Sequence, residues 1–364
     1  MAPILDEIIA RIRRAGETGT PLRIRGGGSK DFYGEPPQGE LLATASLSGI
    51  TSYEPTELVV TAYAGTPLGQ LESVLMQRGQ CLPFEPPHFA RGATVGGMVA
   101  AGLSGPARAS SGSARDFVLG LTMINGRGEL LTFGGQVMKN VAGYDVSRLM
   151  VGALGTLGLI TEVSLKVLPL APAQATLKFQ MDQAQALRRL NEWGGRPLPL
   201  NASCWIEDDG VSVLYLRLRG AAAAVESACM SLGGERSDDS QVNRDWDLCR
   251  DQRLPWFEAL DARDLWRLSV PQTTPVLALP ESPLVEWHGG LRWVRAPRSD
   301  ATRLRELAQR AGGHATLFRA GASSGAAVPR FTPLPGPVER IHRELKRQFD
   351  PAGIFNRGRL YLEL

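Results

Sequence analysis

Apolar and polar positions change period several times along this chain, and each change predicts an element. From Met1 to Gly16, isoleucines and leucines alternate with charges at helical spacing, which predicts an amphipathic helix. A short alternating stretch, Leu22 to Arg25, predicts a strand that runs directly into a glycine run. Leu58 to Ala64 predicts a second strand, followed by a helix with one apolar face that ends at Gly79.

Further strand patterns complete the first part of the chain. Phe117 to Ile124 and Leu130 to Phe133 predict two strands joined through Asn125-Gly126, a dipeptide that accepts positive φ. Ile160 to Leu168 predicts another strand, which ends at Pro169. The first part of the chain is therefore predicted to mix helices and strands with tight turns between them.

Beyond Pro172 the pattern predicts hairpins and helices. Hairpins interleaved with helices favour an antiparallel sheet with helices on one face. The segment from Gly233 to Arg253 is polar and predicts no element. The predicted helices are 182–193, 221–232, 301–311 and one beginning near 338, and the predicted strands are 203–207, 211–218, 265–270, 284–287, 291–295 and 315–319.

The composition and the net charge exclude some classes of function for this chain. The chain has 364 residues and a net charge of +3, with basic residues scattered along it, so nothing favours a nucleic-acid partner. Its four cysteines lack any C-x-x-C spacing, which indicates neither an iron–sulfur cluster nor a zinc site, and we expect no metal. The amino-terminal pattern is not that of a secretory signal, so a cytoplasmic location is expected.

Glycine-dense segments carry the candidate chemistry. Glycines after a strand let backbone N–H groups turn toward an anion such as a pyrophosphate, although Gly26 to Gly28 could equally form an ordinary turn. Thr94 to Gly102 is small at nearly every position and suits close packing beside a ligand or a tight helix contact. Two further segments are Lys139 to Asp145 and Gly152 to Ile160. None matches a P-loop or a Rossmann fingerprint.

The order of these segments and their amino-acid sequences resemble those of one protein family. RGGGSKDFYG, ATVGGMVAAGLSGPARASSGSARDFVLGL, KNVAGYDVSRLMVGALGTLGLITEVSLKVLP and LKRQFDPAGIFNRGRLY together resemble the FAD-binding fold shared by vanillyl-alcohol oxidase and p-cresol methylhydroxylase. Within that family the chain is most similar to the smaller flavin subunits, the E subunits, of bacterial glycolate oxidases. The resemblance implies an α+β fold: a two-subdomain FAD-binding domain of the p-cresol methylhydroxylase type plus an antiparallel-sheet α+β cap domain.

The resemblance also implies where FAD lies. The first loop and the Thr94 turn would hold the pyrophosphate, the 110–116 stretch would lie along the flavin, and the 155–160 segment would close over the adenine half. The implied cofactor-binding residues are Arg25, Gly26, Gly27, Gly28, Ser29, Thr94, Gly96, Gly97, Ser110, Gly112, Ser113, Arg115, Asp116, Gly155, Leu157, Gly158 and Ile160.

Three departures from the wider family bear on mechanism. Ser29 stands where covalent members carry a flavin-linking histidine, so the FAD is expected to be non-covalent. The H-G-D-G-N-L-H-like strand of related 2-hydroxy-acid dehydrogenases does not occur in this chain, and Leu154 replaces an acidic residue of the related GSEGTLG segment. Autonomous substrate oxidation by this chain is therefore an open question.

Oxidation of a 2-hydroxy acid needs a base for the hydroxyl proton and a cation for the carboxylate. His314, at the start of a predicted strand, and Arg319 are the candidate catalytic pair, although His314 could simply occupy a hydrogen-bonded turn. His288 in a hairpin turn and His342 on an amphipathic helix favour structural roles. His88 is a candidate only because it lies near the second glycine segment.

These observations lead to a predicted organisation and function. We expect an FAD-binding domain over residues 1–172, a cap domain over 173–325, and a carboxyl-terminal helix and tail over 326–364 that return to the first domain. The resemblance implies an FAD-bearing subunit of a multi-subunit glycolate dehydrogenase that makes glyoxylate and passes electrons to an iron–sulfur subunit, beside a larger paralogous flavin subunit. Peripheral association with the inner face of the membrane would come through that complex.

Two alternatives remain open at this point. One is a non-catalytic flavin-binding subunit that supports assembly while the larger paralogue oxidises the substrate. The other is a stand-alone reductase of the same fold that takes electrons from a nicotinamide.

Overall fold

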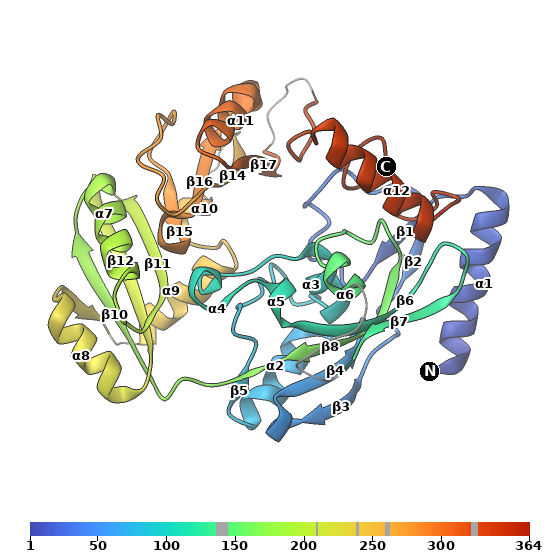
Figure 1. Ribbon diagram of the computed structural model, residues 1–364, viewed down its shortest axis with the longest axis horizontal. Coiled ribbons are helices and arrows are strands. Elements are labelled where there is room, and N and C mark those ends of the chain that lie inside the picture. Colours follow the sequence, from blue (N-terminus) through green and yellow to red (C-terminus); the bar gives the residue numbers. More distant parts are fainter. Residues whose placement is uncertain (136–144, 209, 238–239, 259–262, 322–326) are drawn as a thin grey trace.

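Two β-sheets organise the molecule, with the first built mainly from the amino-terminal part of the chain and the second from the middle part (Figure 1). The computed structural model describes residues 1–135, 145–208, 210–237, 240–258, 263–321 and 327–364. Within these ranges, no helix is long and apolar enough to cross a membrane.

The first sheet has five antiparallel strands in the order β3-β4-β8-β6-β7. Leucines of α2 and the small apolar residues of α3 bury against it, because both helices present one apolar face. The elements are β3 (Ile50–Glu54), β4 (Val59–Tyr63), β6 (Val118–Ile124), β7 (Leu130–Gly134), β8 (Leu159–Lys166), α2 (Leu68–Gln77), α3 (Val95–Ala101), α4 (Arg108–Ser111), α5 (Ala114–Phe117), α6 (Val146–Leu149) and the short helix η1 (Pro55–Glu57).

A smaller layer lies beside this sheet and joins the two ends of the chain. Helix α1 (Ala2–Thr18) packs Ile8 and Ile12 against the parallel pair β1 (Leu22–Arg25) and β2 (Glu40–Ala43). Phe355, which follows α12 (Gly336–Phe349), enters the same apolar cluster. A two-stranded pair, β5 (Gln80–Cys81) with β9 (Leu168–Pro169), leads toward the second sheet.

The β6–β7 turn forms differently from the sequence prediction. Asn125 and Gly126 were expected to supply the positive φ, but the left-handed residue is Gly128, with φ of 70°. The Asn125 carboxamide oxygen instead accepts hydrogen bonds from the amides of Arg127 and Glu129, at 2.9 and 3.0 Å. The side chain therefore closes the turn, as asparagine commonly does in Asx turns.

The second sheet has eight strands in the order β13-β10-β12-β11-β15-β16-β14-β17, and every pair of neighbours is antiparallel. This confirms the predicted antiparallel cap sheet. Its elements are β10 (Ala173–Gln180), α7 (Gln183–Gly194), β11 (Leu200–Asp208), β12 (Val211–Gly220), α8 (Ala222–Leu232), β13 (Glu235–Ser237), α9 (Ser240–Arg250), α10 (Pro255–Glu258), β14 (Asp264–Ser269), β15 (Leu284–Glu286), η2 (Trp287–Gly289), β16 (Leu291–Ala296), η3 (Arg298–Asp300), α11 (Ala301–Arg310) and β17 (His314–Arg319).

Helices cover both faces of the cap sheet, where the sequence predicted one. Helices α7 and α8 pack on one face with Trp205, and α11 packs on the same face further along. Helix α9 lies on the opposite face, toward the FAD-binding part, and buries Val242, Trp246 and Cys249. The sequence analysis left α9 and β10 without a predicted element, because the apolar positions of α9 are sparse among polar ones.

Candidate active site

Two glycine-bearing loops form a cradle at the end of β1. A Cβ atom placed on Gly27 would lie 1.4 Å from the carbonyl oxygen of Gly92, and one on Gly26 would lie 2.4 Å from Oγ1 of Thr94. Thr94 is also the N-cap of α3, where its hydroxyl accepts a hydrogen bond from the Gly97 amide at 3.2 Å. These loops can approach each other closely only because they lack side chains.

The cradle presents unused backbone donors. The amides of Gly26, Gly27, Gly28 and Ser29 donate to no acceptor within the described parts of the chain. Gly28 adopts φ of 73°, a left-handed conformation that lets successive N–H groups turn toward one side of a loop. Such a concave row of amides fits the oxygen atoms of a diphosphate. The residues present therefore fit the phosphate portion of FAD.

The carboxyl-terminal tail holds this cradle in place. The Asn356 side chain accepts the Ile24 amide at 2.7 Å and donates to the Leu154 carbonyl at 2.6 Å, so it joins β1 to the 153–158 loop. The Arg359 guanidinium donates to the carbonyl oxygens of Lys30, Asp31 and Glu35 in the loop after the cradle. The sequence analysis quoted the motif that contains Asn356 and Arg359 without giving either residue a role.

The 155–160 segment lies partly in the core. Gly155 has φ of 71° and approaches the Asn356 carboxamide, where a Cβ would lie 2.7 Å from Nδ2. Gly158 packs against Met123, and the side chains of Leu157 and Ile160 are buried in the core beside the first sheet. Backbone positions, rather than these apolar side chains, are therefore what the segment can offer a cofactor.

The 110–116 stretch divides between two environments. Ser113 and Arg115 line a large cavity, whereas Ser110 shares a hydrogen bond of 2.9 Å with Nε2 of His288 in the cap. Asp116 accepts from both the amide and the hydroxyl of Ser113 at 2.8 Å, which forms a capping box at the start of α5. Gly112 has φ of 102° and ends α4. The third glycine segment, Lys139 to Tyr144, lies outside the described residues.

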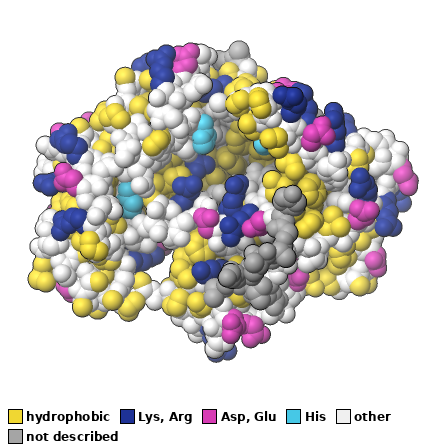
Figure 2. Space-filling view, viewed as in Figure 1, with side chains coloured by type: hydrophobic (Ala, Val, Ile, Leu, Met, Phe, Trp, Pro, Cys, Tyr) yellow, Lys and Arg dark blue, Asp and Glu magenta, His cyan; other side chains and the backbone are white. Residues whose placement is uncertain are grey.

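The large cavity has a volume of about 760 Å³ and lies between the glycine-rich loops and the cap sheet. Figure 2 shows basic side chains gathered in the hollow at the middle of this face. Gly102 and Gly152 contribute backbone to its wall, and a Cβ on Gly152 would meet no atom within 4 Å. The volume lies within the range of small-molecule sites.

Arg115 is one of four basic residues that line this cavity, and we refer to the other three, Arg108, Arg267 and His314, as the basic trio. The Arg108 and Arg267 guanidinium groups lie 4.4 and 5.0 Å from the centre of the Trp287 ring. Desolvation lowers the pKa of His314, and the charges of Arg267 and Arg108 lower it further. Desolvation and the charge of Arg267 also lower the pKa of Arg108. The cavity therefore disfavours further positive charge and favours an anion.

The predicted catalytic pair is not brought together. His314 begins β17 at the cavity, but the Arg319 guanidinium lies 4.7 Å from the Phe32 ring centre and donates to Gln252 at 3.2 Å. The two residues lie at opposite ends of β17: His314 pairs with Ser269, whereas Arg319, beyond a register shift, pairs with Leu265. Arg267, on the neighbouring strand β14, lines the cavity instead.

The other histidines occupy structural settings. Nε2 of His88 pairs with Glu72 at 2.8 Å, and the His342 ring packs edge-on to Tyr361. His288 is buried and adopts φ of 53°, within a turn where Trp287 and Gly289 also have positive φ. Burial lowers the pKa of His288 to about 4, so its imidazole is neutral.

Sequence reasoning missed four cavity residues: Tyr33, Arg108, Arg267 and Trp287. Tyr33 lies in the quoted RGGGSKDFYG motif, and burial raises the pKa of its hydroxyl despite the nearby Arg267 guanidinium. Arg267 carried a usable signal, since it is a charged residue within the otherwise apolar strand pattern Leu265 to Leu268. Among the described residues, no group of three or more His, Cys, Asp or Glu side chains is arranged to hold a metal ion.

An ion-pair cluster joins the two parts of the molecule beside this site. Glu85, in the loop between β5 and α3, accepts hydrogen bonds from Arg217 at 2.7 Å and Arg219 at 2.8 Å, both on β12. Asp251, after α9, accepts from the amide of His88 at 2.7 Å in the same loop. The cap sheet thus fixes the loop that leads into the Thr94 turn.

Comparison with known proteins places these features in a family. The profile of an FAD binding domain matches residues 5–134, which confirms the predicted cofactor class. The fold resembles a solved alkyldihydroxyacetonephosphate synthase with a TM-score of 0.66 at 14% identity, over 96% of this chain and 74% of that one. This likeness confirms the predicted fold class.

Sequence relatives are more specific. The chain is 32% identical to a D-lactate dehydrogenase of Archaeoglobus fulgidus over 45% of its length and 37% of that protein, and 30% identical to glycolate oxidase subunit GlcD of Bacillus subtilis over 47% and 37%. It is 44% identical to glycolate oxidase subunit GlcE of Escherichia coli K12 over 98% of its own length and 97% of that protein. The chain therefore belongs to the GlcE family of glycolate oxidase subunits.

Proposed function

We propose that this chain is an FAD-bearing subunit of a glycolate oxidase and that its cavity binds glycolate for oxidation to glyoxylate. One observation carries the proposal: an anion-favouring cavity of about 760 Å³ is walled by Gly102 and Gly152, in the same part of the chain as the first glycine loop, whose free amides suit a diphosphate. The family match to an FAD binding domain supplies the cofactor class. FAD, when bound, would accept the hydride from the substrate carbon.

For the cofactor, we propose non-covalent binding by the residues named from the sequence. The free amides of the first loop support a pyrophosphate position between Arg25–Ser29 and the Thr94–Gly97 turn. Ser113 and Arg115, which line the cavity, suit contacts along the flavin. The main chain of Gly155 to Ile160 would meet the adenine half, since Leu157 and Ile160 direct their side chains into the core.

For the substrate, the basic trio suggests a division of roles. Arg108 and Arg267 would bind the carboxylate, because guanidinium groups match carboxylate geometry and retain their charge. His314, kept neutral by its surroundings, would accept a hydrogen bond from the substrate hydroxyl and orient it. Arg267 replaces Arg319 as the carboxylate partner in this proposal, since Arg319 stacks on Phe32 away from the cavity.

The proposal includes partners. Two of the relatives are named as subunits of glycolate oxidase. The four cysteines of this chain lack the spacing of an iron–sulfur ligand set. We therefore propose that a larger paralogous flavin subunit of the GlcD kind and an iron–sulfur subunit complete the enzyme. The expected location of that complex is the cytoplasm at the inner face of the membrane, which cell fractionation would test.

The domain division remains part of the proposal. Domains over residues 1–172 and 173–325, with 326–364 returning to the first, are supported by the change of sheet between β9 and β10 and by the tail contacts of Asn356. A second candidate function, a flavin-binding assembly subunit without its own turnover, is favoured by the missing H-G-D-G-N-L-H-like strand.

Anaerobic mixing tests the proposal. The full chain with bound FAD, alone and with its partner subunits, is mixed with glycolate, and bleaching of the flavin absorbance band is followed. Bleaching in the isolated chain supports a working site. An Arg267→Met variant should need at least about tenfold more glycolate, as expected for the loss of one charged hydrogen-bonding partner. Arg319→Met, on the neighbouring strand, is the matched control.

The outcomes separate the candidate functions. The assembly role would be supported if the FAD of this chain stays oxidised both in the isolated chain and in a reconstituted complex. In that complex, the FAD of the GlcD-type subunit would be reduced by glycolate. Bleaching by NADPH instead of glycolate would support a nicotinamide-dependent reductase. A chain that binds no FAD even with its partners would contradict all three.

A further inference from the structure

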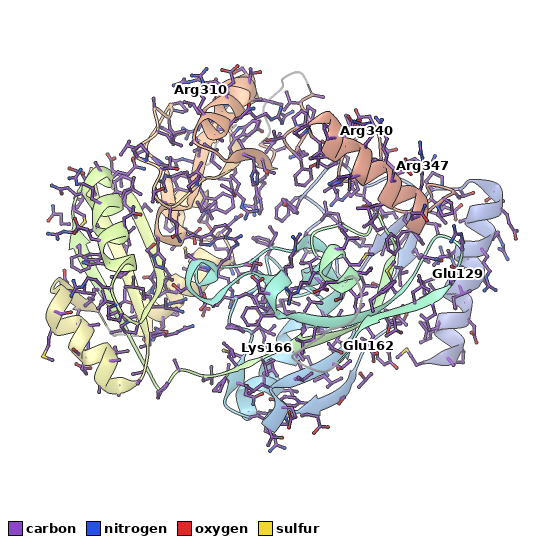
Figure 3. All side chains as sticks on the ribbon, viewed as in Figure 1. Glu129, Glu162, Lys166, Arg310, Arg340 and Arg347 are labelled. Atoms are coloured by element: carbon purple, nitrogen blue, oxygen red, sulfur yellow. The ribbon has the colours of Figure 1, made fainter. Side chains whose placement is uncertain are left out.

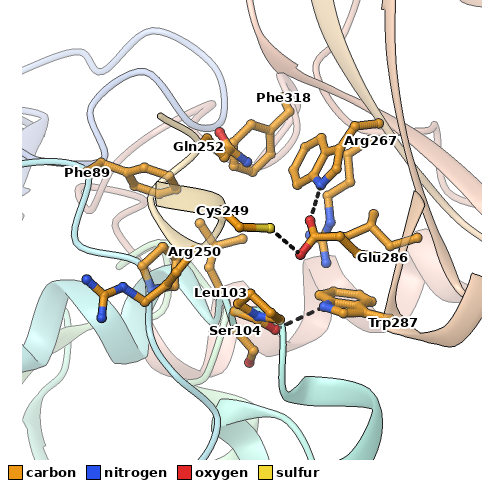
Figure 4. Close-up of a pocket in the computed structure, with 15 residues that line it drawn as sticks. Phe89, Leu103, Ser104, Cys249, Arg250, Gln252, Arg267, Glu286, Trp287 and Phe318 are labelled. Atoms are coloured by element: carbon orange, nitrogen blue, oxygen red, sulfur yellow. Dashed lines mark hydrogen bonds between the residues drawn. The ribbon is translucent and has the colours of Figure 1, made fainter. Parts of the chain in front are cut away.

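Behind the basic trio lies a buried carboxyl group to which the proposed function gives no role. Glu286, at the end of β15, is 4% exposed. Its oxygen atoms accept hydrogen bonds from the Trp293 indole N–H at 2.6 Å and the Cys249 thiol at 3.4 Å (Figure 4). Neither donor carries a charge that would balance an ionised carboxylate.

A small void beside this carboxyl group shares lining residues with the substrate cavity. The void has a volume of about 20 Å³ and is lined by Glu286, Ser104 and Cys249 among others, which leaves room for a water molecule. Arg267 and Trp287 line both this void and the large cavity. The two spaces therefore share a wall that carries the Arg267 guanidinium and the Trp287 indole.

The basic trio itself is poorly suited to hold a proton released by the substrate. A protonated His314 would carry a third positive charge beside Arg108 and Arg267, and its surroundings already lower its pKa. Burial, in contrast, raises the pKa of Glu286 to about 7. The hydrogen bonds from Trp293 and Cys249 and the charge of Arg267 lower this pKa, but burial outweighs them. Near neutral pH the carboxylate can thus take up a proton that the imidazole cannot retain.

We propose that Glu286 accepts the hydroxyl proton of the 2-hydroxy acid, through the water-sized void beside Arg267, and is coupled by Arg267 to carboxylate binding. The inference rests on the proposed function. In the step, the hydroxyl gives up its proton to the Glu286 carboxylate, and FAD, when bound, would take the hydride from the carbon. A carbonyl double bond forms, and the carboxyl group later returns the proton to water.

The charged and titratable groups around Glu286 come from several elements. Arg267 of β14 lowers its pKa, and Glu85 of the loop before α3 raises it. Cys249 of α9 lies beside Cys204 of β11, and the pKa of Cys249 is held well above its usual value, first by a hydrogen bond with Cys204 and then by burial. Arg250, beside Cys249, lines the void. Near pH 7, Glu286 is the member of this group expected to change charge.

Proton uptake on anion binding tests the coupling without turnover. Oxalate, a small carboxylate with no hydroxyl to oxidise, is titrated into the FAD-loaded chain by calorimetry in two buffers of different ionisation enthalpy. An anion beside Arg267 should raise the pKa of Glu286, so up to about half a proton should be taken up at pH 7. The Glu286→Gln variant should take up none, and Glu281→Gln, which breaks the partly buried ion pairs with Arg263 and Arg295 in the same domain, should behave as wild type.

Flavin reduction provides the second readout. In the wild type, the rate of reduction by glycolate should rise with pH through an inflection near 7, because only the ionised carboxylate accepts a proton. Glu286→Gln should be slower by about 10²-fold or more and lose the inflection. Trp293→Phe removes a hydrogen bond that lowers the pKa of Glu286, so it should move the inflection to higher pH.

The outcomes distinguish this inference from the proposed function. Equal proton uptake in wild type and Glu286→Gln, or an inflection that persists in Glu286→Gln, overturns the role of Glu286. An absence of glycolate reduction in the wild type overturns the proposed function and the hydroxyl-proton step, while the oxalate titration still decides the coupling between Glu286 and Arg267.

Discussion

At the scale of single residues, the cradle depends on the absence of Cβ atoms. Gly27 and Gly92 face each other so closely that a methyl group on Gly27 would overlap a backbone carbonyl, which cannot rotate away as a side chain can. Gly28 adds the positive φ that few other residues adopt without cost. The same small residues leave the amides of the loop open toward a ligand.

A Gly27→Ala substitution should therefore weaken FAD binding by at least about tenfold, which corresponds to about 1.4 kcal/mol. The loop must move away from Gly92 to accept the methyl group, and the amides lose their common direction. The measurement is titration of the apoprotein with FAD, followed by quenching of flavin fluorescence. Gly69→Ala, in α2, is the control because its Cβ would meet no atom within 4 Å. Unchanged affinity in Gly27→Ala would place the diphosphate elsewhere.

At the scale of elements, α12 connects the tail to the 153–158 loop through one inward-facing lysine. Lys346 is buried and donates to the carbonyl oxygens of Thr156 and Phe355 and to the Asp350 carboxylate, at 2.7, 2.8 and 2.7 Å. Asp350 in turn accepts the amides of Ile354 and Phe355. By contrast, Arg340 and Arg347 on the same helix point outward (Figure 3).

A Lys346→Met substitution should lower the free energy of unfolding by about 3–5 kcal/mol, because it leaves the buried Asp350 charge without a partner. Chemical denaturation followed by tryptophan fluorescence measures the change. Arg347→Met removes an exposed pair with Glu344 and should cost less than about 1 kcal/mol. If the double variant Lys346→Met, Asp350→Leu is no more stable than Lys346→Met alone, the unpaired charge is not the cause.

At the scale of the whole molecule, the site exists because two sheets meet across an ion-pair cluster. The Glu85 carboxylate lies between Arg217 and Arg219, and Arg217 is only 2% exposed. Burial works to raise the pKa of Glu85, but the two guanidinium groups outweigh it and hold the pKa below its usual value. Since the folded state favours the ionised form, this contribution to stability is complete above the unfolded pKa near 4.5 and is lost as the pH falls below it.

Glu85→Gln should consequently destabilise the protein at pH 7 by about 3–5 kcal/mol, because Arg217 keeps a buried charge without its partner. The difference from wild type should shrink as the pH falls below about 4.5 and Glu85 itself becomes protonated. Thermal unfolding at several pH values measures the trend, and hydrogen exchange should increase in the loop of residues 83–91. A difference that stays constant with pH would contradict a role for the charge.

Much of the secondary structure and the cofactor loops could be predicted from the chain alone. Strand 22–25, the helix after Pro67 and the glycine loops follow from local periodicity and from the backbone freedom of glycine, which depend on neighbours in sequence. Helix α9 was missed although Val242, Trp246 and Cys249 have helical spacing, because these three apolar positions stand among many polar residues. The turn at Asn125 also differed from the prediction. The Asn125 side chain closes it by accepting backbone amides, and this competes with the positive φ expected of the Asn-Gly dipeptide.

The sequence by itself determined that this is an α+β flavoprotein with a diphosphate-binding loop, because that information lies in contiguous motifs. Only the tertiary structure decided which side chains share the cavity. It separated Arg319 from His314, because they lie at opposite ends of β17, and it brought Arg108 of α4 and Arg267 of β14 together around Trp287. It also buried Glu286 behind them. Proximity between residues far apart in the chain depends on how the sheets pack, and no local pattern encodes that distance.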